Sequence, residues 1–205
     1  MRIASKQLIK NLCKDKSSLE KFEVNEIMKE ISKEIKVPVF NTNVINKEKI
    51  LTEKEYIEIL KKCRTPRQRY FMKFLYETGC RVNEMTSIKK QKCLKDGENV
   101  FFEVRGKGIA RQVKIKINLY NKINALFNGS VYLFETSSGK RYQNDYISKQ
   151  IKKIGKLIDR DISAHTFRHS HITNKIIKNP ADIKSISISV GHRHAGSTLN
   201  YYYHN

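Results

Sequence analysis

The spacing of apolar positions predicts helices in the first part of the chain. Apolar residues recur at helical intervals over 17–35, from 52 to about 63, and from 66 to a stop at Gly79. A further helix is expected to start near Asn83. Each of the first three opens on Ser or Thr with Glu or Gln three positions later, at Ser17 and Glu20, Thr52 and Glu55, and Thr65 and Gln68.

Near residue 97 the period changes from helical to alternating. The stretches NVFFEV (99–104) and RQVKIKI (111–117) flank GKG (106–108), which predicts a β-hairpin with a glycine-flanked tip. SVYLFET (130–136) is expected to add a third strand. Helices return with an isoleucine stripe over 147–158, then over 166–178, from 179–182 onward and from Ser197. The expected fold is mostly α with a small antiparallel β-sheet.

The pattern also divides the chain into two parts. Pro38 ends the first helix, and residues 37–50 have the composition of a linker. We therefore expect a short N-terminal helical segment and linker over 1–50, followed by the main domain over 51–205.

The charge balance indicates that this mostly helical protein binds polyanions. Lys and Arg total 41 against 20 Asp and Glu, a formal net charge of +21. Such a surplus favours nucleic acid as the partner, although a codon bias toward Lys would also raise the charge. We find no apolar run of transmembrane length and no basic amphipathic helix of the membrane-binding kind, so no membrane partner is expected.

The cysteines indicate the redox compartment. No two of them have C-x-x-C spacing, which favours reduced, mostly buried thiols in a cytoplasmic, nucleoid-associated protein. The four are Cys13, Cys63, Cys80 and Cys93.

The stretch HTFRHSHIT (165–173) concentrates imidazole and guanidinium groups. His165 and His169 would share a helix face, as zinc ligands do, but Arg168 between them would repel a dication. The alternative without a binding function is that these histidines are solvated or packed imidazoles on a basic surface. A phosphate fits better, because the planar guanidinium matches two phosphate oxygens and a histidine can donate to a third.

Further cationic groups and a candidate nucleophile occur in comparable settings. Arg81 follows a glycine helix stop and precedes Glu84, Lys107 lies at the hairpin tip, and His192 follows a glycine. Three consecutive tyrosines follow at 201–203. Together these residues would form a cationic cage with an oxygen nucleophile.

This ordered set resembles the tyrosine recombinases, the phage-integrase family. The motifs are T-G-x-R-x-x-E (78–84), G-K-G (106–108), H-x-x-R-H (165–169) and G-H (191–192), with a tyrosine nine residues after His192. The resemblance covers about 51–205. It implies the catalytic-domain fold of that family and needs no metal or other cofactor.

The resemblance implies which residues bind the scissile phosphate. Arg81 and Arg168 would hold its non-bridging oxygens, and His192 would add a hydrogen bond. Glu84 would support the arginines from behind. Such donors stabilise the extra negative charge of the transition state more than that of the ground state.

The resemblance also implies the nucleophile and the proton transfers. Tyr201 would attack phosphorus, with Tyr202 as the alternative and Tyr203 as the least favoured choice. His165 would hydrogen-bond the phosphate and accept the tyrosine proton. Lys107 would protonate the departing 5′ oxygen, with Lys114 and Lys116 of the following strand as alternatives.

The implied function is a site-specific DNA recombinase or integrase of a mobile element, working through a 3′-phosphotyrosyl intermediate. Its partners would be a double-stranded recombination site and three more copies in a DNA-bound tetramer, with a monomer in free solution. Two departures stand out: four residues follow Tyr201, and the part before 51 is short for a DNA clamp. They keep alternatives open, namely a non-cleaving DNA-binding regulator, a type IB topoisomerase-like enzyme, or a basic RNA-binding protein.

Overall fold

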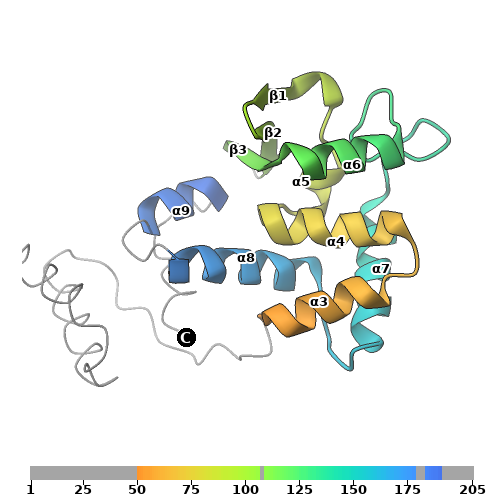
Figure 1. Cartoon of the computed structure of the whole chain (residues 1–205), viewed down its shortest axis with the longest axis vertical. Helices are drawn as coiled ribbons and strands as arrows, with labels where there is room; N and C mark the ends of the chain where they lie inside the picture. The colour runs from red at the N-terminus through yellow and green to blue at the C-terminus, as the bar shows by residue number, and fades with distance from the viewer. Residues whose placement is uncertain (1–49, 107–108, 179–182, 191–205) are drawn as a thin grey trace, which may run out of the picture. The chain divides into compact units, whose positions relative to one another are not determined.

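The computed structural model describes residues 50–106, 109–178 and 183–190, and the fold is given for these residues (Figure 1). The helices expected over 17–35 and from Ser197 lie outside them. The division of the chain at residue 50 therefore stays a prediction.

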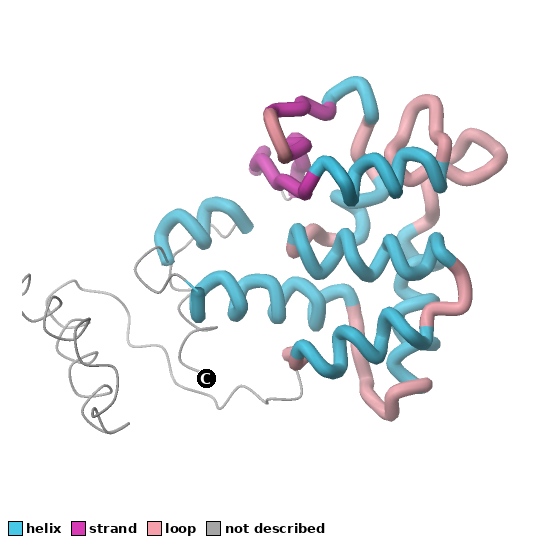
Figure 2. Tube along the Cα trace, viewed as in Figure 1, coloured by secondary structure: helices cyan, strands magenta, loops and turns pink. Residues whose placement is uncertain are grey.

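The described elements are mostly helical, as expected, with one three-stranded antiparallel sheet (Figure 2). The helices are α3 (Glu53–Lys62), α4 (Pro66–Thr78), α5 (Val82–Thr86), the 3-10 turn η2 (Lys90–Lys92), α6 (Ile117–Phe127), α7 (Asn144–Lys156), α8 (Ala164–Lys178) and α9 (Ile183–Val190). The strands are β1 (Cys93–Asp96), β2 (Asn99–Gly106) and β3 (Ile109–Lys116).

The helix boundaries in the first half follow from local chemistry. The Thr52 hydroxyl accepts from the Glu55 backbone N–H, and the Glu55 carboxylate accepts from the Thr52 N–H at 2.8 Å. Thr65 and Gln68 repeat this capping box at the start of α4, with Pro66 in the first helical position. Gly79 ends α4 in the left-handed conformation (φ 60°). These starts and this stop are confirmed.

The hairpin prediction is also confirmed. β2 and β3 pair in register from Asn99 with Lys116 to Gly106 with Ile109, and the tip residues 107–108 lie outside the described part. Val100, Phe102 and Val104 are buried on one face of β2, and the intervening residues are more exposed. The alternation thus gives one face to the core and one to solvent.

The third strand was wrongly predicted at 130–136. The strand that joins the hairpin is β1, and 130–136 forms turns with two isolated bridges. The cause is Glu135, whose carboxylate accepts backbone N–H bonds from residues 130, 131 and 132. These hydrogen bonds lower the pKa of the Glu135 carboxyl to about 2. They also occupy the N–H groups that a strand would use to pair with a neighbouring strand.

A helix that the apolar pattern did not predict, α6, follows β3 directly. It buries Leu119, Tyr120, Ile123 and Phe127, and Asn128 ends it in the left-handed conformation. α8 also begins two residues earlier than expected, at Ala164.

The core is organised around α4. This helix packs against α3, α5, α6, α7, α8 and β3, and in Figure 1 it runs between α6 and α8. Its buried residues Phe71 and Phe74 meet Phe127, Phe134 and Tyr142 in a network of edge and tilted ring contacts. Gly79 and Arg81 therefore follow directly after the C-terminus of the central helix of the domain.

A second, smaller apolar cluster joins α8 to α9. Its members are Ile172, Ile176, Ile186 and Val190. Within the described ranges, no helix is both long and apolar enough to span a bilayer.

Candidate active site

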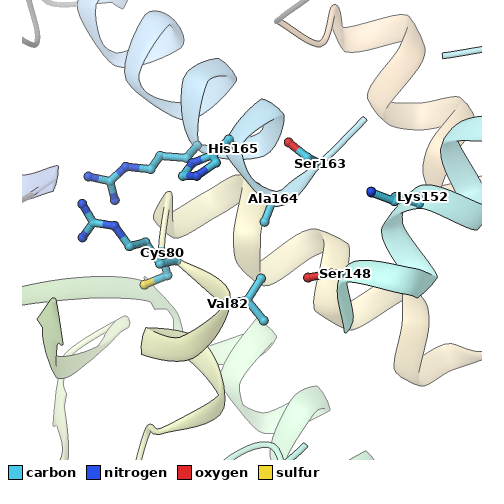
Figure 3. Close-up of a pocket in the computed structure, with 9 residues that line it drawn as sticks. Cys80, Val82, Ser148, Lys152, Ser163, Ala164 and His165 are labelled. Carbon is cyan, nitrogen blue, oxygen red and sulfur yellow. The ribbon is translucent and has the colours of Figure 1, made fainter. Parts of the chain in front are cut away.

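Three segments distant in sequence surround one pocket of about 420 Å³ (Figure 3). They are the junction between α4 and α5, one face of α7, and the start of α8. The lining residues are Cys80, Arg81, Val82, Ser148, Lys152, Ser163, Ala164, His165 and Arg168. Three of the predicted site residues, Arg81, His165 and Arg168, thus line the same pocket.

Arg81 is fixed by the short helix that it caps. Its backbone N–H donates to Glu84 Oε2 at 2.7 Å, and its Nη1 donates to Glu84 Oε1 at 3.0 Å. The Arg81 side chain stays 31% exposed, whereas the Glu84 side chain is 1% exposed. The structure therefore brings Glu84 behind the Arg81 guanidinium, as the spacing predicts, and leaves the guanidinium open to the pocket.

Glu84 also holds a second arginine that the sequence analysis missed. Arg111 Nη2 donates to Glu84 Oε2 at 2.6 Å, and the Arg111 side chain is 4% exposed. A signal was available, because Arg111 alternates with Val113 and Ile115 on the inward face of β3. An arginine at an inward position requires a buried acceptor.

Arg168 lies deep in the pocket wall. It is 4% exposed, its Nη1 donates to the Gly79 carbonyl at 2.8 Å, and its Nη2 donates to the Val190 carbonyl. Arg168 thereby ties α8 to the end of α4 and to the end of α9.

The last turn of α9 is held by two guanidinium groups. Arg168 binds the Val190 carbonyl, and Arg111 Nη1 donates to the Ser189 carbonyl at 3.4 Å. Helix C-termini leave such carbonyls without intrahelical donors and favour nearby positive charge. The segment that follows α9 in the sequence contains His192, Tyr201 and Tyr202, which lie outside the described residues, as Lys107 does.

The three histidines of the 165–173 stretch separate in the structure. His165 is exposed at the start of α8 and lines the pocket, and His169 is partly exposed and does not line it. His171 is buried and its Nδ1 donates to the Tyr76 carbonyl at 3.0 Å. In this structure His171 is therefore a packing residue.

His171 is expected to make stability depend on pH. Burial, and then nearby Lys175, lower its pKa from 6.5 to about 3, so it is neutral in the folded state. Protonation favours the unfolded chain; the stabilising contribution is therefore complete above pH 6.5 and is lost as pH falls toward 3. We expect urea unfolding at pH values between the two pKa values, from about 5.5 to 4.5, to show a slope about 1.4 kcal/mol per pH unit steeper in wild type than in His171→Asn. Equal slopes would contradict this role.

Gly79 is expected to tolerate no side chain. It has φ 60°, and a Cβ there would lie 2.7 Å from His171 Cδ2. We expect Gly79→Ala to lower the free energy of unfolding by about 1–3 kcal/mol. Gly97→Ala is the matched control, because Gly97 has φ 52° and no atom within 4 Å of a Cβ. Equal losses in the two variants, measured by urea unfolding, would show that the contact with His171 contributes nothing.

Cys80 also lines the pocket but is not a candidate nucleophile. Burial raises its pKa, so the thiol stays protonated, and a thiolate is the reactive form. Cys63 and Cys93 are free as well, and burial raises the pKa of each to about 11. In the part of the chain that the structure describes, no three His, Cys, Asp or Glu side chains gather as a metal site.

Known proteins are similar to this chain in sequence and in fold. The chain is 29% identical over 166 residues to tyrosine recombinase XerA of Pyrococcus horikoshii, covering 75% of this chain and 56% of XerA. It is 30% identical over 139 residues to tyrosine recombinase XerD of Chlamydia trachomatis, covering 62% and 45%. The chain thus spans about half the length of these curated relatives.

A solved structure agrees with these relatives at the level of the fold. The XerH site-specific recombinase bound to its difH substrate superposes with a TM-score of 0.64 at 21% identity, over 75% of this chain and 50% of that one. The model of the phage integrase family matches residues 49–205. The chain therefore belongs to the phage integrase family of tyrosine recombinases.

Proposed function

We propose that this chain cleaves and rejoins duplex DNA at a specific site through a 3′-phosphotyrosyl intermediate, as a site-specific recombinase or integrase. The observation that carries the proposal is the convergence of Arg81, His165 and Arg168 on one pocket. Glu84 pairs with both Arg81 and Arg111 from the buried side, one negative charge against two positive charges. The open side keeps a surplus of positive charge, which suits a phosphodiester.

The cage would act on the phosphate by differential binding. During attack the non-bridging oxygens gain negative charge, and donors fixed beforehand stabilise that charge without reorganising. Arg81 is held by Glu84, and Arg168 by two backbone carbonyls, so both are fixed before DNA binds. His192 would complete the set from the segment after α9.

The proposed reaction exchanges one phosphate ester for another. The Tyr201 oxygen bonds to phosphorus and its proton passes to His165. The bond from phosphorus to the 5′ oxygen breaks, and Lys107 gives that oxygen a proton. Rejoining runs the same steps backward, so the tyrosyl ester stores the energy of the broken bond and no cofactor is consumed. Tyr202 is the alternative nucleophile.

The proposed partners are a duplex recombination site and further copies of the chain. The net charge of +21 supports a polyanionic partner. The related XerH structure contains its difH substrate, and the lambda integrase structure is a dimer bound to a core site, with a TM-score of 0.59 to this chain at 15% identity. We propose a monomer in solution that assembles into a tetramer on DNA.

The cleavage activity that is lost in Lys107→Ala should return on a DNA substrate with a better leaving group. We expect Lys107→Ala to slow cleavage about 100- to 10,000-fold, because the 5′ oxygen then leaves without a proton. A substrate with sulfur in place of that oxygen leaves readily as a thiolate. Cleavage of this substrate should therefore be nearly equal in wild type and Lys107→Ala. Full activity of Lys107→Ala on ordinary DNA would contradict the assignment. The same slow cleavage and the same rescue by sulfur in Lys114→Ala or Lys116→Ala instead would move the role to that lysine.

The function is tested by offering two duplexes that carry the end sequence of the chain's own genomic element. A recombinase yields duplexes with exchanged strands and leaves a supercoiled plasmid without the site unchanged. Relaxation of that plasmid without exchange would favour a topoisomerase-like enzyme. Tight, salt-sensitive binding without any strand breakage would favour a regulator.

A further inference from the structure

One wall of the pocket has no part in the proposed chemistry. Ser148 and Lys152 project from α7, four residues apart and so on one helix face, and Ser163 lies before the start of α8. Figure 3 shows Ser148 and Lys152 on the opposite side of the pocket from Cys80. The wall therefore faces the same space as the arginine cage.

Close packing brings this wall into place. α7 buries Ile147, Ile151 and Ile154, which turns Ser148 and Lys152 away from the core. A Cβ on Gly155 would lie 2.5 Å from the Arg160 carbonyl oxygen, so the turn after α7 folds back against the helix only because that residue is glycine. The turn returns the chain to Ser163, beside α7.

The charge of the pocket suits more than one phosphate. Among the described lining residues there is no Asp or Glu, while Arg81, Lys152, His165 and Arg168 can all carry positive charge. Lys152 makes no ion pair within the described part of the chain. Ser148 and Ser163 add hydroxyl donors to the wall.

The size of the pocket points the same way. Its volume of about 420 Å³ is many times the space that a single water needs. One phosphate between the arginines leaves most of this space unfilled. Along one DNA strand the next phosphate is only about 3.4 Å further along the helix axis, so a strand with one phosphate in the cage brings its neighbours to the same pocket.

We propose that Ser148, Lys152 and Ser163 form a second phosphate subsite, which binds a DNA backbone phosphate adjacent to the scissile one. The inference rests on the proposed function, since it takes the scissile phosphate to lie between Arg81 and Arg168. The subsite sets the position of the strand along the pocket. Lys152 supplies the charge, and the two hydroxyls fix the orientation.

The test removes one phosphate charge at a time. After the cleaved position is located on unmodified DNA, the two phosphates on either side of it are replaced singly by neutral methylphosphonates. Binding is measured for the full-length wild type, Lys152→Ala and Lys153→Ala. Lys153 is the matched control, because it is the next residue on α7, is exposed and does not line the pocket.

We expect one methylphosphonate to weaken wild-type binding about tenfold, the loss of a hydrogen bond to a charged group. Lys152→Ala should bind unmodified DNA about tenfold more weakly, lose about one unit of salt slope, and be insensitive to that same replacement. Lys153→Ala should keep the full sensitivity of wild type.

Two failures are distinguishable. If Lys152→Ala responds to every methylphosphonate as wild type does, the subsite is wrong and the proposed function stands. If wild type forms no covalent complex with unmodified DNA, the proposed function is overturned, and the subsite with it.

Discussion

Arg81→Lys is expected to slow DNA cleavage about 100- to 1,000-fold, the usual cost of losing one fixed donor to a transition-state oxyanion. Lysine keeps the charge but not the planar fork that addresses two oxygens at once. The Arg81 guanidinium is held by Glu84 at 3.0 Å and is 31% exposed at the pocket. The change should therefore act on the chemical step and leave the fold intact.

The measurement is single-turnover cleavage of a saturating DNA substrate, with urea unfolding in parallel. Arg64→Lys is the control, because Arg64 is an exposed arginine between α3 and α4 and does not line the pocket. A cleavage rate in Arg81→Lys within a few-fold of wild type would remove Arg81 from the cage.

Glu84→Ala is expected to lower the free energy of unfolding by about 3–5 kcal/mol, because it leaves a buried charge without its partner. Arg111 is 4% exposed and donates to Glu84 at 2.6 Å, so its guanidinium would lose its carboxylate inside the protein. Arg81 would lose its support at the same time. Cleavage should therefore fall even at temperatures where the variant remains folded.

A double variant separates the two arginines. In Glu84→Ala with Arg111→Met, the orphaned charge is gone, so part of the lost stability should return while cleavage stays slow. Glu103→Ala is the control, since that exposed carboxylate pairs with exposed Arg105 and its loss should change stability little. A Glu84→Ala protein as stable as wild type would contradict the buried ion-pair account.

Local signals made much of the fold predictable. The capping boxes at Thr52 and Thr65 and the left-handed stop at Gly79 act within four residues, so the sequence contains the whole cause. The hairpin was predictable for a similar reason, because stretches of alternating apolar positions lie on both sides of GKG, and β2 and β3 pair across it.

The errors arose where a distant or specific contact decides the structure. Residues 130–136 look like a strand, yet the Glu135 carboxylate ties up their backbone N–H groups. β1 is short and largely exposed, with Leu94 63% exposed, so it has no apolar alternation to detect. Backbone pairing with β2 stabilises β1 in place of a buried apolar face.

The candidate site was partly predictable. The order and spacing of motifs identified Arg81, Glu84, His165 and Arg168. In the structure Arg81 contacts Glu84. Arg81, His165 and Arg168 line one pocket. The role of Arg111 depends on a contact between β3 and α5 that no local spacing encodes. Lys107, His192, Tyr201 and Tyr202 stay predictions, because they lie outside the described residues.

The central claim is that a tyrosine of this chain becomes covalently joined to DNA. The most direct measurement incubates wild type, Tyr201→Phe, Tyr202→Phe and Tyr203→Phe with a nicked duplex that traps the cleaved strand, followed by denaturing electrophoresis. We predict a DNA-bound band that survives SDS in wild type and Tyr203→Phe and is absent from Tyr201→Phe. A band that persists in Tyr201→Phe and disappears in Tyr202→Phe would move the nucleophile by one residue. The absence of any band from wild type, with DNA bound, would contradict the account.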